Sequence, residues 1–94
     1  MPVSPADLTV GRWVVFRPDR SLPLWHAGRV HAVRGDRVTV VEPFALTPRG
    51  RTYRLPYPSV SVLLSEMEAV LDHRPTPEDI QALLASRAVP AQEG

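Results

Sequence analysis

With 94 residues, of which 44% are hydrophobic and 22% are charged, the chain has the composition of one small globular domain and not of a disordered segment. Its formal net charge is only +1, and it contains no Cys, which excludes disulfides, thiolate catalysis and thiolate metal sites. No apolar run approaches the roughly 20 residues that a membrane-spanning helix needs, and residues 1–10 lack the basic and apolar regions of a secretory signal, so we expect a cytoplasmic protein.

The first half of the chain contains three runs that are typical of β-strands. They are rich in Val and Trp and span about residues 12–17, 24–33 and 37–42. The loop 18–23 begins and ends with Pro, which predicts a stiff connection between the first two strands. A meander of this kind, followed by more short strands, is typical of a small closed barrel.

The turn between the second and third strands allows two registers. A two-residue turn sets Ala32 opposite Thr39, whereas a three-residue loop sets Val30 opposite Val40. The second register matches the apolar faces of the two strands, and we therefore predict the three-residue loop. Gly28 lies in the middle of the second strand, where it predicts a bulge or a sharp bend.

Two further short strands are expected after a second loop. Residues 43–50 form that loop, and the strands span about residues 51–55 and 60–63. Pro56 and Pro58 follow the fourth strand, and because Pro cannot donate a ladder hydrogen bond, they confine the end of this strand to a sheet edge.

A short helix is predicted over residues 65–73. Ser65 and Glu68 have the spacing of a capping box, and Arg74-Pro75 ends the segment. The apolar residues that form one face of this expected helix are Met67, Val70 and Leu71.

A second helix is predicted from Thr76 onward, with Thr76 as the N-cap and Pro77 at the first helical position. It carries an apolar stripe that either folds back on the barrel or docks against another protein or a second copy. The stripe consists of Ile80, Leu83 and Leu84. Together these elements predict a small β-barrel with its lead-in over residues 1–64, a helical extension packed on or beside it over 65–89, and a frayed tail over 90–94.

Several positions of the strands carry a family resemblance. They are Gly11, Val14 and Val15 in the first strand, Trp25-His26-Ala27-Gly28-Arg29-Val30 in the second, and Val38 and Val40 after the turn. On these residues the segment 11–64 resembles a Src-homology-3-like small barrel of the Tudor or KOW kind. It is also similar to the RNA-polymerase-interacting domain of CarD-type transcription factors, although the tail here is short and acidic, whereas a DNA-contacting tail would be basic. The resemblance implies a mainly β (α+β) fold, with a five-stranded barrel followed by two short C-terminal helices, and a non-catalytic binding role.

The distribution of charge suggests an anionic partner. Residues 1–57 contain nine Arg and four acids, a balance of +5, whereas residues 58–94 contain two Arg and six acids, a balance of −4. A basic barrel could contact nucleic acid or a nucleic-acid-processing complex through Arg and aromatic side chains; alternatively, the acidic tail neutralises the barrel within one molecule. The candidate nucleic-acid-binding residues are Arg29, Arg37, Arg51 and Arg54, with Trp25 and Tyr53 as stacking rings.

The alternative function is that of a protein-binding adaptor or accessory subunit, with a protein partner or a homodimer formed through the barrel or through Ile80, Leu83 and Leu84. Nucleic-acid binding predicts that the Arg side chains gather on one face, whereas an adaptor predicts dispersed Arg and an exposed apolar patch.

The sequence contains no motif of catalysis or of metal binding. We find no Gly-rich phosphate loop and no nucleophile with a supporting base. His26 and His31 fall on opposite faces of a regular strand, and no carboxylate accompanies them. We therefore expect no enzyme activity, no metal, no cofactor, no small-molecule substrate and no membrane partner.

Overall fold

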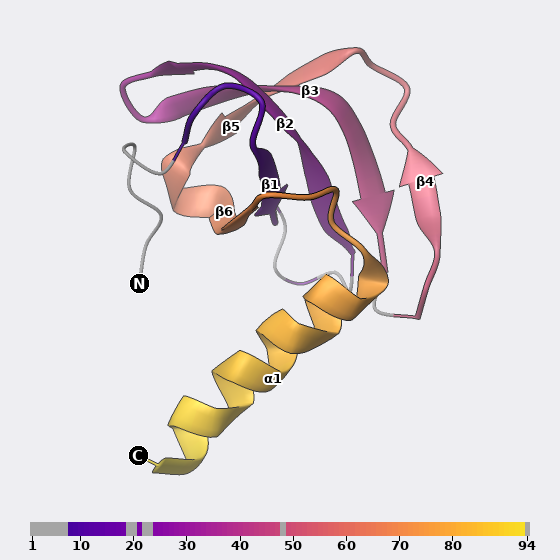
Figure 1. The fold of residues 1–94 in the computed structure, drawn as a ribbon, viewed down its shortest axis with the longest axis vertical. Coiled ribbons are helices and arrows are strands. Elements are labelled where there is room, and N and C mark those ends of the chain that lie inside the picture. The colour runs from indigo at the N-terminus through magenta and orange to yellow at the C-terminus, as the bar shows by residue number, and fades with distance from the viewer. Residues whose placement is uncertain (1–7, 19–20, 22–23, 48, 94) are drawn as a thin grey trace.

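Six strands form one bent antiparallel sheet, and a single long helix follows them (Figure 1). The computed structural model describes residues 8–18, 21, 24–47 and 49–93, with side chains up to residue 85. The elements are β1 (Trp13–Phe16), β2 (Trp25–Arg34), β3 (Arg37–Leu46), β4 (Thr52–Arg54), β5 (Ser59–Leu63), a 3-10 turn (Leu64–Glu66), β6 (Met67–Leu71) and α1 (Pro77–Glu93). No helix in the described part of the chain is long and apolar enough to cross a membrane.

The strands follow the order β4-β3-β2-β1-β6, and β5 pairs with β3 on the same edge as β4. The predicted mainly β architecture is confirmed, and all five predicted strands form. The closed five-stranded barrel is not confirmed, because the sheet has a sixth strand and no ladder joins β6 to β4 or β5 within the described ranges.

The sheet buries apolar side chains on both faces. Neighbouring residues Val14 and Val15 belong to different hydrophobic clusters, as the alternation of side chains along a strand requires. The first cluster lies on one face of the sheet and is formed by Leu8, Val14, Phe16, Val30, Val38, Val40, Val62 and Met67. The second lies on the opposite face, beneath the start of α1, and is formed by Val15, Trp25, Ala27, Phe44, Leu46 and Ile80.

A bulge bends β3 in its middle, where the sequence predicts a loop. Between the pairs Ala27↔Phe44 and Arg29↔Val41, β2 has one residue and β3 has two, Glu42 and Pro43. Glu42 has a φ of 55°, the left-handed conformation of the first residue of a glycine-type bulge. The opposing Gly28 leaves the space for this approach, because a Cβ there would lie 2.3 Å from Val40 Cγ1. The bend predicted at Gly28 is confirmed, and β3 continues past Pro43 to Leu46.

The β2–β3 turn combines the two registers considered from the sequence. Val30 pairs with Val40 as predicted, but a register shift then brings Ala32 opposite Thr39 and Arg34 opposite Arg37. The connection is therefore the two-residue turn, and the predicted three-residue loop is wrong. The register shifts by one residue at His31. This irregularity allows Val30 to face Val40 while the strands are still joined by a two-residue turn.

The predicted helix over residues 65–73 is wrong, since β6 occupies most of this segment. The register between β1 and β6 shifts after Val15, so that Glu68 is an extra residue. Because of this bulge, Met67 and Val70, which are three positions apart, both pack into the first hydrophobic cluster. A spacing of three is also the spacing of a helical face, so the bulged strand has the apolar pattern of a helix. The sheet consequently extends to residue 71, and the helical part begins at Pro77 and not at residue 65.

The second predicted helix is confirmed and is capped as expected. The Asp79 N–H donates to Thr76 Oγ1 at 3.4 Å, and the Thr76 N–H donates to Asp79 Oδ2 at 2.8 Å. Burial raises the pKa of the Asp79 carboxyl, but hydrogen bonds with Thr76 and His73 outweigh it, so that this pKa lies below its ordinary value. The helix continues to Glu93, past the predicted boundary at residue 89, and its C-terminal half extends beyond the sheet (Figure 1).

Candidate functional site

The four Arg residues predicted to bind nucleic acid do not form one cluster. Arg37 begins β3, opposite Leu63. Arg51 lies past the other end of β3, where its carbonyl accepts a hydrogen bond from the Thr47 N–H. A ten-residue strand is roughly 30 Å long along its path. The predicted set therefore divides into groups at different ends of β3.

Arg29 is neutralised within the molecule. Its Nη2 donates to Glu42 Oε1 at 2.7 Å, and its guanidinium carbon lies 5.7 Å from the centre of the Trp13 ring. Because its charge is already paired, Arg29 contributes less attraction for phosphate than an unpaired Arg would.

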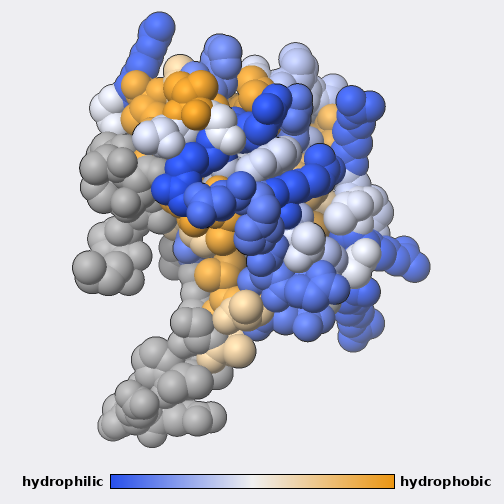
Figure 2. All heavy atoms as spheres, viewed as in Figure 1, coloured by the Kyte–Doolittle hydropathy of each residue, from blue (hydrophilic) through white to orange (hydrophobic). Residues whose placement is uncertain are grey.

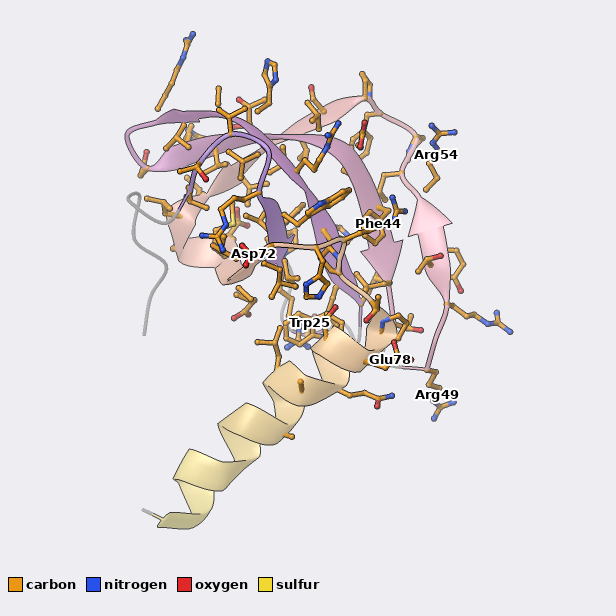
Figure 3. The ribbon with its side chains drawn as sticks, viewed as in Figure 1. Trp25, Phe44, Arg49, Arg54, Asp72 and Glu78 are labelled. Carbon is orange, nitrogen blue, oxygen red and sulfur yellow. The ribbon has the colours of Figure 1, made fainter. Side chains whose placement is uncertain are left out.

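Trp25 is a core residue, and its prediction as an exposed stacking ring is wrong. Only 1% of its surface is accessible, and it lies beneath the first turn of α1 (Figure 3). Arg17 covers another part of the ring, with its guanidinium carbon 4.5 Å from the ring centre. The sequence predicts Trp25 beside a loop, but it cannot show that α1 folds back over this position.

The remaining predicted residues lie in one basic segment, residues 49–58, which we call the β4 arm. It contains Arg49, Arg51 and Arg54 and two exposed tyrosines, Tyr53 and Tyr57, with accessible fractions of 46% and 41%. No acid occurs in the sequence between Glu42 and Glu66, and no ion pair of these three Arg is found within the described residues. The β4 arm is therefore a concentrated positive surface with aromatic rings.

A groove of about 540 Å³ lies beside the β4 arm. Its lining comes from three parts of the chain: the bulged stretch of β3, the β4 arm and the linker before α1. The lining residues are Val41, Glu42, Pro43, Phe44, Thr52, Tyr53, Arg54, Leu55, Tyr57, Pro58 and Arg74. Arg54 pairs with Phe44, and the preceding Tyr53 pairs with Ala45. The side chains of Tyr53 and Arg54 therefore lie on opposite faces of β4. Since both line the groove, it runs over the exposed edge of this strand.

Two packed aromatic rings, of which Phe44 lines the groove, support its β3 side. Phe44 is 3% accessible and packs edge-on against Trp13, with ring centres 6.4 Å apart. Arg74 lies across both rings, 4.3 Å from the centre of Phe44 and 5.7 Å from that of Trp13. This stacked guanidinium adds a positive charge to the β3 side of the groove. In Figure 2, hydrophilic side chains gather over the middle of the sheet and around β4, and Figure 3 shows Arg49 and Arg54 near opposite ends of β4.

The apolar stripe of α1 is largely used within the molecule. Ile80 has no accessible surface, and Leu83 is half-buried against the same cluster, so of the two alternatives left open by the sequence the stripe folds back on the sheet. The prediction of Ile80 as a docking residue is wrong for this reason. Leu84, with 41% of its surface accessible, is the member of the stripe that stays exposed.

The structure also places the three His residues. His26 is half-buried and packs edge-on against Phe16 at 5.5 Å, and burial lowers its pKa. His73 Nε2 lies 3.0 Å from Asp79 Oδ2, and His31 is exposed on β2. Within the part of the chain that the structure describes, no three His, Cys, Asp or Glu side chains form a group that could hold a metal ion.

Of the residues that line the groove, the sequence predicts only Tyr53 and Arg54 as site residues, and it does not predict Glu42, Phe44, Tyr57 or Arg74. The acid-free stretch between Glu42 and Glu66, with three Arg and two Tyr, is the sequence signal that marks the β4 arm. Glu42 and Arg74 are far from each other in the sequence, and only the fold brings them to the same groove. No protein-family model, curated protein or solved structure matches the chain. The Src-homology-3-like resemblance therefore stays a prediction.

Proposed function

We propose that this protein is a non-catalytic binding module that holds single-stranded nucleic acid along the β4 arm. The observation that carries the proposal is the groove itself, in which exposed Tyr53 and Tyr57 lie beside Arg54, a cation with no ion-pair partner among the described residues. Proteins that bind single strands combine a basic path for the backbone with rings on which bases stack. The β4 arm offers both within one short segment.

The Arg side chains of the β4 arm are suited to phosphates. Arg49, Arg51 and Arg54 follow each other along an edge strand and its preceding turn. Three phosphate contacts on a single strand give a slope of about −2 for the logarithm of the binding constant against that of the salt concentration. A rise from about 50 to 200 mM salt then lowers the affinity about 20-fold.

The tyrosine rings favour single strands over duplexes. A base can stack on Tyr53 or Tyr57 only if its own face is free, and in a duplex both faces are covered by neighbouring base pairs. Each such stack contributes about 1–3 kcal/mol. The stacking energy adds to the binding energy from the phosphate contacts. A duplex of the same length gains no such stacking energy.

The test is fluorescence anisotropy of labelled single-stranded and double-stranded oligonucleotides at about 50 and 200 mM salt, the range in which phosphate contacts weaken most. We expect micromolar binding of the single strand, weaker binding of the duplex, and the loss at higher salt estimated above. Absence of single-strand binding at the lower salt would refute the proposal. It would direct attention to the adaptor alternative, for which the exposed Leu84 on α1 is the available apolar side chain.

A further inference from the structure

Glu42 has an unusual backbone conformation and lines the groove. Its φ of 55° lies in the left-handed region, which favours glycine, and it is the one residue other than glycine with positive φ within the described ranges. Such conformations persist where the surrounding structure holds them, and they cluster at binding sites. The bulge turns the chain here, so Glu42 lines the groove that Phe44 and Tyr57 also line.

The Glu42 carboxylate is held in place and still has acceptor capacity. Arg29 Nη2 donates to Oε1 at 2.7 Å, which fixes the side chain against β2. The Glu42 side chain remains 56% accessible. A carboxylate has about four lone-pair sites, and the bond from Arg29 uses one of them. No second donor to this carboxylate is found among the described residues, so the other sites can accept hydrogen bonds from a molecule in the groove.

The charges of the groove then orient a bound strand. Glu42 lies on β3 at one side, and Arg54 lies on β4 at the other. The β4 arm carries three Arg, whereas the β3 side carries Arg74 together with the mutually balanced pair of Glu42 and Arg29, so the larger positive charge lies along β4 and the backbone of a strand passes there. The hydrogen-bonding edge of a base is left to face Glu42, because N–H donors are what a carboxylate accepts.

We propose that Glu42 selects an unpaired guanine in the bound strand. This inference rests on the proposed function and names its base preference. Guanine presents two adjacent donors, N1–H and N2–H, which match the two oxygens of a carboxylate. Adenine and cytosine present one exocyclic amino group beside ring acceptors, and thymine presents one N–H between two carbonyl oxygens, which a carboxylate repels. Two matched hydrogen bonds give a preference of about tenfold.

The test uses labelled strands of about ten nucleotides, within the usual site size of such grooves, that contain only thymine apart from one central test base. Anisotropy gives the dissociation constants for guanine, adenine, cytosine and thymine at this position with the wild-type protein and with Glu42→Gln. We expect the guanine strand to bind wild type about tenfold more tightly than the thymine strand. In Glu42→Gln the ratio should fall below about threefold, because the amide has only one acceptor oxygen.

Asp36→Asn is the matched control, because it removes one negative charge at the exposed β2–β3 turn, away from the groove. It should keep the guanine preference, although the loss of an acid raises the affinity for every strand slightly. Circular dichroism spectra of both variants establish that they are folded. Equal affinities of wild type for the four strands, or an unchanged preference in Glu42→Gln, would overturn the assignment of Glu42 while single-strand binding stands. Failure of all four strands to bind would refute the proposed function as well.

Discussion

Replacement of Trp25 by alanine is expected to lower the free energy of unfolding by about 3–5 kcal/mol, the usual cost of truncating a large buried aromatic ring. Trp25 is 1% accessible and lies in the cluster between the sheet and α1, together with Leu46 and Ile80. The cavity would remove contacts from both elements at once. Since a domain of this size is stable by only about 5–15 kcal/mol, the variant would lose a large share of its stability and unfold at a lower temperature than wild type.

Urea denaturation followed by far-ultraviolet circular dichroism measures this loss, and two further variants separate a core role from a binding role. Trp25→Phe keeps most of the buried area and should fold and bind oligonucleotides like wild type. Tyr53→Ala removes a ring that is 46% accessible, so its unfolding free energy should change by less than about 1 kcal/mol while its affinity for single strands falls. A stable Trp25→Ala variant with impaired binding would contradict the placement of this ring in the core.

The double charge reversal Arg51→Glu with Arg54→Glu is expected to weaken single-strand binding at about 50 mM salt by 100-fold or more. Each lost phosphate contact removes about 1 kcal/mol of Coulomb attraction at contact distance in water, and each new carboxylate adds a repulsion of similar size. Both residues are exposed, so the variant should keep the stability of wild type. Anisotropy with a thymine-only strand measures the effect.

The matched control is Arg34→Glu with Arg37→Glu, the facing pair at the end of the β2–β3 hairpin. It changes the net charge by the same amount at the other end of β3. If attraction by the β4 arm is local, the control loses only the long-range part of the electrostatic attraction, about tenfold or less at low salt. Equal losses in the two double variants would show that total charge, and not the β4 arm, determines binding.

The strands of this protein were predictable because their signals are local. Runs of Val and aromatic residues, a Gly-Asp turn and Pro at the strand ends depend on near neighbours, and they correctly predicted β1, β2, β4 and β5. The bend at Gly28 was predictable for the same reason, since a glycine within a strand indicates either a bulge or a close approach of another chain segment.

The errors arose where a bulge changes the period of the side chains. Glu68 interrupts β6, and its extra residue gives Met67 and Val70 a helical spacing within a strand. Glu42 and Pro43 form the bulge of β3, so a stretch that reads as a loop continues as a strand. In both cases the bulge depends on the neighbouring β-strand, whose residues are far away in the sequence. The side-chain pattern within one β-strand does not show which residues of the neighbouring strand will pair with it.

The candidate site was predictable only in part. Arg51, Arg54 and Tyr53 follow from composition, because basic and aromatic residues adjoin in an acid-free stretch. Pairing of Arg29 with Glu42 depends on the register between β2 and β3, and burial of Trp25 depends on where α1 packs. Burial and charge pairing are properties of the tertiary structure, and they decide which of several equivalent Arg and Trp residues remain available to a ligand.

The most direct test of the account is amide chemical-shift mapping of the isotope-labelled protein during titration with a thymine-only single strand. We predict the largest shifts in the amides that line the groove, which are those of Val41, Glu42, Phe44, Thr52, Tyr53, Arg54, Leu55, Tyr57 and Arg74. The tip of the β2–β3 hairpin, residues 34–37, should change little. Shifts confined to that hairpin or to α1, or no shifts at all with the strand in large excess, would contradict binding along the β4 arm.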